Sequence, residues 1–369
     1  MRNPNDQRRL LAQVILLVRS RRANSRRLLA GLLRLSPTTS GQYVDQLIAG
    51  GYLRESGLEH GAMGRPKRML ETEAEAGWFA GIEFNADRIQ TARVNFSGVK
   101  SGSLITTLPE GVSPSAVIAA IHRGIVALGR DSVGPLLGIG VGVPGIADPF
   151  SGVGRDYAYI EGWKDIPIAQ MLRETYGVKV TVDNNLRTIA LAERWFGGAS
   201  DLADYVIVGP RSGFGVAIVA GGRLVTGEEH AAGEIGRWPW SNGGELQEAL
   251  SAPAVWRRLA EKSQRESLPS DLRGALESLA SERKVVRGEI LAEYARVLGN
   301  LHLLLNAHTY FLHGPLTALG DAFCTDVTLA IRALVPSLGE KPIRLVRSQL
   351  GDDAGALGAA SLAMEGWHP

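Results

Sequence analysis

The run Leu136–Val143, LLGIGVGV, constrains the fold more than any other stretch of the chain. Eight apolar or glycine residues in succession, without polar alternation, are typical of a parallel strand that is buried on both faces. Before it we predict strands at Trp78–Asn85, Arg88–Phe96 and Ser103–Thr107, then a helix at Pro114–Leu128. A parallel strand needs a crossover connection, usually a helix, so this order predicts an α/β domain.

A second strand, Val178–Val182, turns into an amphipathic helix that runs to Phe196. Asp183, Asn184 and Asn185 lie at the turn, where short polar side chains can cap the helix and can also face a ligand. Both roles use the same atoms, so both stay open. Further strands and helices predict a second lobe that repeats the theme of the first, at Tyr205–Val208, Gly213–Val219, Val286–His308, Tyr310–His313 and Asp321–Leu334. A closing segment, Ser348–Leu350 and then Asp352–Met364, follows this lobe.

The net charge of +2 hides an asymmetry between a basic head and an acidic body. Residues 1–70 hold 13 Lys and Arg against 4 Asp and Glu, whereas residues 71–369 hold 27 against 34. A basic head on an acidic body suggests contact with a polyanion such as double-stranded DNA. The sequence has neither a membrane-spanning apolar run nor a signal-peptide core, so we expect a cytoplasmic protein without membrane contact. The single cysteine, Cys324, excludes a disulfide framework and a multi-cysteine zinc site.

The head is predicted to hold three short helices and a two-stranded wing. Helix Asp6–Arg21 has apolar residues at helical spacing, and Asn24–Ser25 caps a second helix with Leu28, Leu29, Leu32 and Leu33 inward. Ser36 is a good N-cap for the third helix, Pro37–Ala49, whose outer face is short, polar and almost free of acid. Tyr52–Glu55 and Arg68–Glu71 are the expected strands of the wing.

A helix-turn-helix with a wing predicts DNA contact through the third helix and the wing. The candidate DNA-binding residues are Thr38, Thr39, Gln42, Gln46, Arg65, Lys67 and Arg68. Arg65 stands between Gly64 and Pro66, as suits an arginine inserted into a narrow minor groove. The alternative is that the three helices form only a packing or dimerisation module, which would leave the basic wing unexplained.

Several motifs, taken together and in order, resemble the ROK family of bacterial sugar-dependent repressors and sugar kinases. They are GVGVPGIADPFSG, Gly162–Trp163 with Asp165 and Pro167, VDNN, ALAERWFG, AAGEIG and SQLGDDAGALGAA, and the resemblance covers essentially the whole chain. It implies a winged helix-turn-helix at 1–72, a linker at 73–78, and at 79–369 a two-lobed actin-like ATPase or sugar kinase (ribonuclease H-like) fold that binds effector and dimerises.

The chain departs from the family pattern at the positions that carry kinase chemistry. The resemblance puts a catalytic aspartate where this chain has Asn185, whose amide cannot take a proton from a sugar hydroxyl at neutral pH. The first phosphate-binding turn, glycine-rich in the family, is Glu83–Asp87 here and has no glycine. The zinc-binding histidine is Arg237, and the following loop, Trp238–Glu245, has no cysteine. We therefore expect no catalytic residue, metal or cofactor.

The resemblance maps an effector pocket onto Asn184, Asn185, Glu234, Arg237 and Gln247. Arg237, with Arg187 nearby, could bind an acidic or phosphorylated sugar, or it could replace zinc structurally by pairing with Glu234 or Glu245.

We thus expect a repressor of carbohydrate-related genes that binds a palindromic operator as a homodimer or tetramer and responds to a sugar-like effector. One alternative is an active sugar kinase with a DNA-binding appendage. Another is a DNA-binding protein whose ligand-free body serves as a dimerisation or docking platform.

Overall fold

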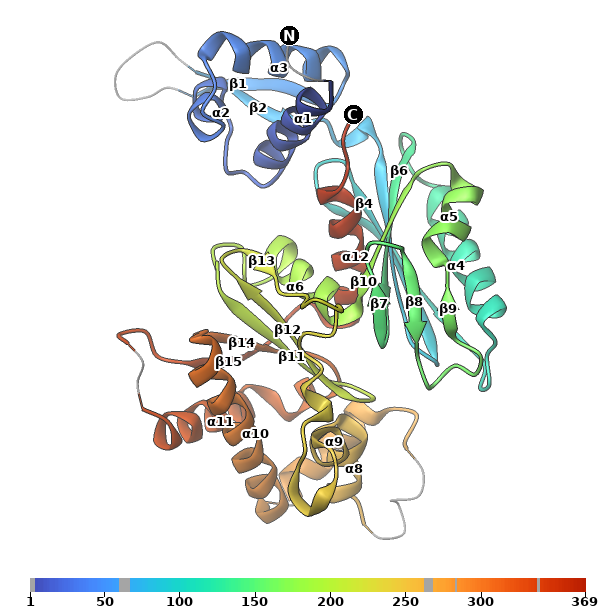
Figure 1. Cartoon of the computed structure of the whole chain (residues 1–369), viewed down its shortest axis with the longest axis vertical. Coiled ribbons are helices and arrows are strands. Elements are labelled where there is room, and N and C mark those ends of the chain that lie inside the picture. The colour runs from blue at the N-terminus through green and yellow to red at the C-terminus, as the bar shows by residue number, and fades with distance from the viewer. Residues whose placement is uncertain (1–3, 60–66, 262–267, 283, 337–338) are drawn as a thin grey trace. The chain divides into compact units, whose positions relative to one another are not determined.

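The computed structural model describes residues 4–59, 67–261, 268–282, 284–336 and 339–369 (Figure 1). The chain forms two compact units, Met1–Leu191 with Gly355–Pro369, and Ala192–Ala354. We call residues 1–72 the head, the rest of the first unit lobe one, and the second unit lobe two. No helix of the described ranges is both long enough and apolar enough to cross a membrane.

The head has the predicted order of three helices and a hairpin: α1 (Pro4–Arg19), α2 (Arg26–Leu32), α3 (Pro37–Ala49), β1 (Leu53–Glu59) and β2 (Lys67–Thr72). The predicted caps are confirmed, since the hydroxyls of Ser25 and Ser36 accept from backbone N–H groups of α2 and α3. One prediction is wrong: Leu28 and Leu32 do not point inward but are 48% and 55% exposed. A helix of only seven residues buries one narrow face, and that face holds Leu29 and Ala30.

Lobe one is built on a five-stranded sheet of order β10-β6-β3-β4-β5. The predicted parallel strand is confirmed, because β6 (Leu136–Val143) pairs in parallel with both β3 (Trp78–Phe84) and β10 (Lys179–Asn184). β4 (Arg88–Asn95) and β5 (Lys100–Thr107) complete the sheet in antiparallel pairing. The remaining elements are α4 (Pro114–Gly129), α5 (Ile168–Tyr176) and the small antiparallel sheet of β7 (Ile146–Asp148), β8 (Val153–Asp156) and β9 (Lys164–Ile166).

The C-terminal helix α12 (Ala354–Glu365) covers the face of this sheet opposite α4 and α5 (Figure 1). It lies so close that a Cβ atom added at Gly81 would stand 1.9 Å from the carbonyl oxygen of Ala356. At Gly140 the same distance, to the carbonyl oxygen of Ala359, would be 1.7 Å. Glycine on two neighbouring strands and alanine on the helix therefore allow the backbones to touch. The closing segment that follows lobe two in the sequence therefore returns to pack on lobe one.

Lobe two repeats the sheet of lobe one, as predicted. Its order, β13-β12-β11-β14-β15, has three antiparallel strands followed by two parallel ones, which is the order of β5-β4-β3-β6-β10. The strands are β11 (Tyr205–Pro210), β12 (Phe214–Ala220), β13 (Arg223–Leu224), β14 (Thr309–Leu312) and β15 (Arg344–Arg347). The helices are α7 (Leu246–Leu250), α8 (Ala252–Leu259), α9 (Leu272–Glu282), α10 (Lys284–Leu305) and α11 (Gly320–Leu334). Cys324 is buried in α11, and burial raises its thiol pKa to about 12.

The chain passes from the first unit to the second within helix α6 (Asn185–Phe196) and returns at the first turn of α12. The segment expected as a linker, residues 73–78, contains a short 3₁₀ turn, Ala74–Ala76. Its Gly77 packs on the loop before β6, where an added Cβ would stand 2.6 Å from the carbonyl oxygen of Pro135. This segment is therefore packed against lobe one rather than freely extended.

Candidate functional site

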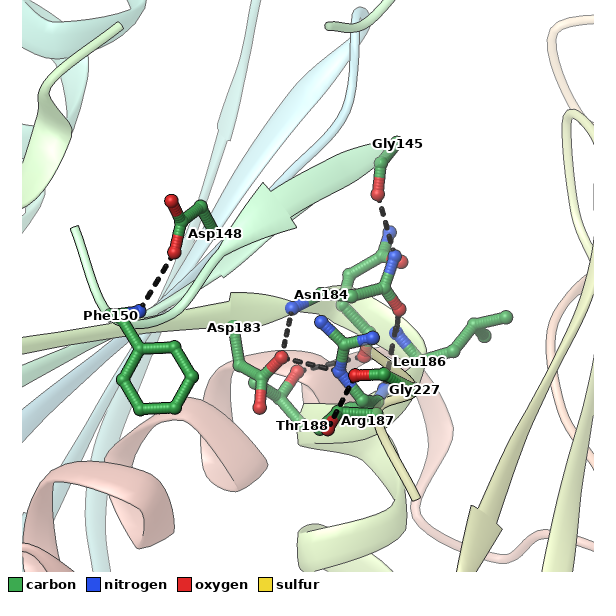
Figure 2. A network of polar contacts seen from close by, with 11 residues as sticks. Gly145, Asp148, Phe150, Asp183, Asn184, Leu186, Arg187, Thr188 and Gly227 are labelled. Atoms are coloured by element: carbon green, nitrogen blue, oxygen red, sulfur yellow. Dashed lines mark hydrogen bonds and ion pairs between the residues drawn. The ribbon is translucent and has the colours of Figure 1, made fainter. Parts of the chain in front are cut away.

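The turn between β10 and α6 is held by a closed network of polar contacts (Figure 2). Asn184 Oδ1 accepts from the backbone N–H groups of Leu186 at 2.9 Å and Arg187 at 3.4 Å, which caps α6. Its Nδ2 donates to the carbonyl oxygen of Gly145 at 2.8 Å. Asp183 Oδ1 accepts from the Asn184 N–H and, at 2.5 Å, from Arg187 Nε. The capping role of Asn184 is thus shown, and one Nδ2–H is left for a ligand.

Arg187 belongs to this network. Its side chain is 4% exposed and forms an ion pair with Asp183, one helical turn away. A buried guanidinium that is already paired is a poor candidate for binding a charged ligand, because its charge is neutralised in place.

Asn185 is 9% exposed and faces the sheet of lobe one, where its Nδ2 donates to Glu83 Oε1 at 3.3 Å. Glu83 is 3% exposed and lies under the start of α12, since an added Cβ at Gly355 would stand 2.4 Å from its Cγ. The position that the family resemblance assigns to a general base therefore holds an amide that is hydrogen-bonded to a buried carboxylate. This pair can bind a hydroxyl group, but the amide cannot take a proton from it.

In the turn between β3 and β4, backbone N–H groups already donate hydrogen bonds within the turn. Asn85 Oδ1 accepts from the N–H groups of Asp87 at 3.2 Å and Arg88 at 2.9 Å. A phosphate-binding turn needs such N–H groups free and pointing at the anion. In lobe two, the hairpin between β11 and β12 also closes on itself, because the Arg211 N–H donates to Gly213 O at 2.9 Å. Both turns are therefore structured as ordinary strand connections.

In lobe two the segment Gly233–Arg237 lies directly on β12. A Cβ added at Gly233 would stand 1.9 Å from the carbonyl oxygen of Val216, and one at Gly236 would stand 2.2 Å from that of Phe214. These two glycines fix Glu234 between them, half-buried, and Arg237 just beyond, exposed. Arg237 forms no ion pair with any side chain of the described residues, so the pairing with Glu234 or Glu245 that would replace zinc is not observed.

The loop Trp238–Glu245 is ordered by hydrogen bonds and aromatic packing. The Trp240 N–H donates to Gly244 O at 2.7 Å, and the Leu246 N–H donates to Trp238 O at 2.9 Å. Trp238 and Trp240 pack against the core of lobe two, and the guanidinium of Arg296 lies 4.1 Å from the centre of the Trp240 ring. These two tryptophans therefore help to hold the loop on lobe two. Gln247 follows the loop and donates to Glu245 Oε2 at 2.5 Å.

On the head, the candidate DNA-binding residues of α3 differ in whether their side chains already have hydrogen-bond partners. Thr39 bonds to the capping Ser36, and Gln46 accepts from Gln7 Nε2 at 3.1 Å. Thr38 and Gln42 are exposed and have no hydrogen bond from their side chains to the described residues. These two are therefore best placed to bind an outside partner.

The wing is tied to the helices by an ion-pair network that was not predicted from the sequence. Arg26 contacts Asp45 of α3 at 2.7 Å and Glu55 of β1 at 3.1 Å, and Glu55 also pairs with Arg68 of β2. Together these contacts lower the pKa of Glu55, most strongly through Arg68. Lys67 begins β2, and Arg65 lies outside the described residues. The alternation of arginine and acid across the predicted strands was the available signal for this network.

Comparison with known proteins gives a consistent result. A family model described as "ROK family" matches residues 80–365. The xylose repressor of Bacillus subtilis is 24% identical over 370 residues, covering 92% of this chain and 91% of that protein. The glucokinase of Thermotoga maritima is 25% identical over 250 residues, covering 62% of this chain and 79% of that protein. A crystal structure of a ROK family transcriptional regulator, a homologue of the Escherichia coli MLC protein, superposes with a TM-score of 0.81 at 18% identity, covering 98% and 96% of the two chains.

Proposed function

The chain belongs to the ROK family, and on that premise we propose that it is a sugar-responsive, DNA-binding transcriptional repressor of carbohydrate-related genes. The observation that carries this proposal is the head, whose exposed helix face and basic charge suit DNA and serve no purpose in a sugar kinase. The full-length match to a relative named xylose repressor supports it. As a repressor the protein would work in the cytoplasm, on a palindromic operator, as a homodimer or tetramer.

We propose that α3 enters the major groove and that Gln42 and Thr38 contact base edges there. A glutamine amide can form two hydrogen bonds with adenine, and a threonine hydroxyl can donate or accept at a base edge while its methyl group touches a thymine methyl group. Thr39, Gln46 and Arg68 already have partners in the head, so they would contact phosphates or support the fold. Arg65 and Lys67 of the wing stay candidates for a minor-groove contact.

The test is to select operator sequences from random DNA with the full chain and to measure affinity by fluorescence anisotropy. Gln42→Ala should weaken binding to the selected operator roughly tenfold to a hundredfold and relax the preference at one base pair in each half-site. Gln170→Ala, an exposed glutamine on α5 of lobe one, is the matched control and should bind like the wild type. Failure of the wild type to enrich any sequence would refute the repressor function.

For the effector we propose a sugar-like molecule, and its candidate contacts stay Asn184, Asn185, Glu234, Arg237 and Gln247. Glu234 can accept from two hydroxyl groups, and Asn184 keeps one N–H to donate. Arg237, which is exposed and unpaired among the described residues, would select an acidic or phosphorylated sugar. We propose further that the protein has lost phosphoryl transfer, because Asn185 is not a base and the first phosphate turn uses its own donors.

A thermal-shift screen of neutral sugars (D-xylose and D-glucose among them), amino sugars, sugar acids and sugar phosphates, with ATP–magnesium in a separate well, tests the effector site. A ligand that binds the native state raises the unfolding midpoint, and Arg237→Gln should abolish the shift with an anionic sugar but not with a neutral one. A coupled assay for ADP production with the same sugars should stay at background. Steady turnover would show that the kinase activity of relatives is retained.

A further inference from the structure

A buried arginine joins the head to lobe one. Arg19, at the end of α1, is 6% exposed and has no carboxylate partner among the described residues. Its Nε donates to the carbonyl oxygen of Phe96 at 2.7 Å, and its Nη1 donates to that of Met364 at 3.1 Å. One acceptor therefore lies just after β4 of lobe one, and the other lies in the last turn of α12.

Aromatic rings enclose the guanidinium group. Its Cζ lies 4.4 Å from the centre of the Phe96 ring and 5.4 Å from that of Phe79, within the range of cation–π attraction. Trp367, beyond α12, contacts the Phe96 ring edge-on at 5.1 Å, and Tyr52, just before β1, contacts both of these rings. We call Arg19, Tyr52, Phe79, Phe96, Met364 and Trp367 the Arg19 cluster.

The Arg19 cluster draws on three separate parts of the first unit. Arg19 and Tyr52 come from the head, Phe79 and Phe96 from β3 and the residue after β4 of lobe one, and Met364 and Trp367 from α12 and the tail that follows it. A second contact runs beside it, because the hydroxyl groups of Thr72 and Ser97 bond at 3.0 Å. Burial without a carboxylate is unfavourable for a cation and lowers the pKa of Arg19 to about 9. Such a contact is costly for mere stability, since an apolar side chain would fill the same space.

Helix α12 connects the Arg19 cluster with the proposed effector residues. At its first turn, Gly355 packs on Glu83, which binds Asn185. About 14 Å along the same helix, the carbonyl oxygen of Met364 accepts from Arg19. We propose that the Arg19 cluster locks the head to lobe one and to α12, so that a displacement of α12 moves the head as a rigid body. This inference rests on the proposed repressor function, for which it names the route from effector to DNA.

The lock can be tested without effector or DNA by measuring distances between spin labels. Arg27→Cys on α2 and Ala127→Cys on α4 place labels at exposed positions of the head and lobe one, while Cys324 is buried and has a raised thiol pKa. We expect one narrow distance distribution in this pair. Adding Arg19→Met should at least double its width, because Met fills the space but donates no hydrogen bond. Arg22→Met, which removes an exposed charge three residues away, should leave it unchanged.

A second variant controls for the possibility that Arg19→Met misfolds. Trp367→Leu removes ring contacts at the end of the chain, and it too should broaden the distribution while the circular dichroism spectrum stays native. A broad distribution in the labelled wild type, or a narrow one in both variants, would overturn the lock.

A DNA-binding measurement separates the failure of the lock from the failure of the repressor function. A head fixed to lobe one fixes the spacing of two heads in a dimer, so moving the half-sites apart by about half a turn of DNA should cost the wild type tenfold or more in affinity. Arg19→Met should lose less than threefold. Equal losses of affinity in the wild type and in Arg19→Met would contradict the lock. Absence of operator binding by the wild type would refute the repressor function, and the spin-label result would then decide on the lock.

Discussion

The contact between α12 and the sheet of lobe one predicts a large difference between two alanine substitutions on the same strand. In Gly140→Ala the new methyl group would stand 1.7 Å from the Ala359 carbonyl oxygen and 2.5 Å from its carbonyl carbon. In Gly138→Ala, two residues away on the same face of β6, the nearest atoms would be at 3.5 Å, an ordinary contact. The two changes are chemically identical, so they isolate the effect of helix position.

The magnitude follows from how far α12 must move. To restore even a 3.0 Å contact, the carbonyl oxygen of Ala359 must retreat by about 1.3 Å. A gap of that size forfeits roughly half of the dispersion energy of the fully buried Ala356, Ala359 and Ala360. Overpacking of this kind costs about 1–3 kcal/mol, and because the obstacle is backbone, the expected cost of Gly140→Ala is about 3 kcal/mol. Gly138→Ala should be neutral or stabilising by up to about 1 kcal/mol, because alanine restricts the unfolded chain.

Urea unfolding followed by circular dichroism measures both free energies, and a thermal melt should show a midpoint lowered by about 6–12 °C for Gly140→Ala. The same variant should broaden the spin-label distribution between head and lobe one, since Met364 and Trp367 move with the helix. If Gly140→Ala unfolds at the same urea concentration as Gly138→Ala, the close packing of α12 on β6 is wrong, and the argument for its role in coupling loses its support.

Two further measurements probe individual side chains. Burial lowers the pKa of His313 from 6.5 to about 3. Between these two pH values the unfolded state binds a proton on this side chain and the folded state does not. The free energy of unfolding should therefore fall as pH drops below about 6.5, and His313 contributes at most about 1.4 kcal/mol per pH unit to this fall. In His313→Asn the free energy of unfolding should change less steeply with pH, by that amount. An unchanged slope would contradict the lowered pKa of His313. Asn184→Ala should destabilise the protein by about 1–2 kcal/mol in urea, because α6 loses its cap and Gly145 loses a donor, whereas Gln170→Ala should stay within about 0.5 kcal/mol.

Long elements with a strong period could be predicted from the sequence, and short ones with little pattern could not. The apolar run of β6 and the capped helix α3 are correct to the residue, because burial on both faces and a Ser–Pro start leave few alternatives. Strand β15, RLVR, was not predicted, since two apolar residues among arginines carry no signal and its partner β14 lies more than thirty residues earlier. The inward orientation of Leu28 and Leu32 fails for a related reason: helical spacing says which residues share a face, but tertiary packing decides how wide a face is buried.

For the candidate site, the residues could be predicted from the sequence, but their hydrogen-bond and ion-pair partners could not. The loss of glycine between β3 and β4 predicted a poor phosphate turn, yet only the structure shows that Asn85 occupies its donors. An asparagine between two predicted strands is a known signal for such a turn and could have been used. Whether Arg237 forms an ion pair within the described residues, and that Arg19 donates to two carbonyl groups, depends on segments far apart in the chain. No local pattern contains that information.

Because Asn185 is hydrogen-bonded to Glu83, we expect that a single substitution at Asn185 will not restore kinase chemistry. In Asn185→Asp an N–H donor becomes an oxygen at 3.3 Å from Glu83 Oε1, so two buried carboxylates would face each other. Like charges at this distance cannot both ionise, and one pKa must rise. We therefore expect a loss of stability of about 1–3 kcal/mol at pH 7.5, relieved toward pH 5 as one group binds a proton, and no phosphorylation of any sugar in the coupled assay. Asn184→Asp, at a half-buried position beside it, is the control for an added charge in the same turn. If Asn185→Asp is as stable as the wild type and consumes ATP in the presence of a sugar, then Glu83 is no barrier, and the family's catalytic site is intact but for one atom.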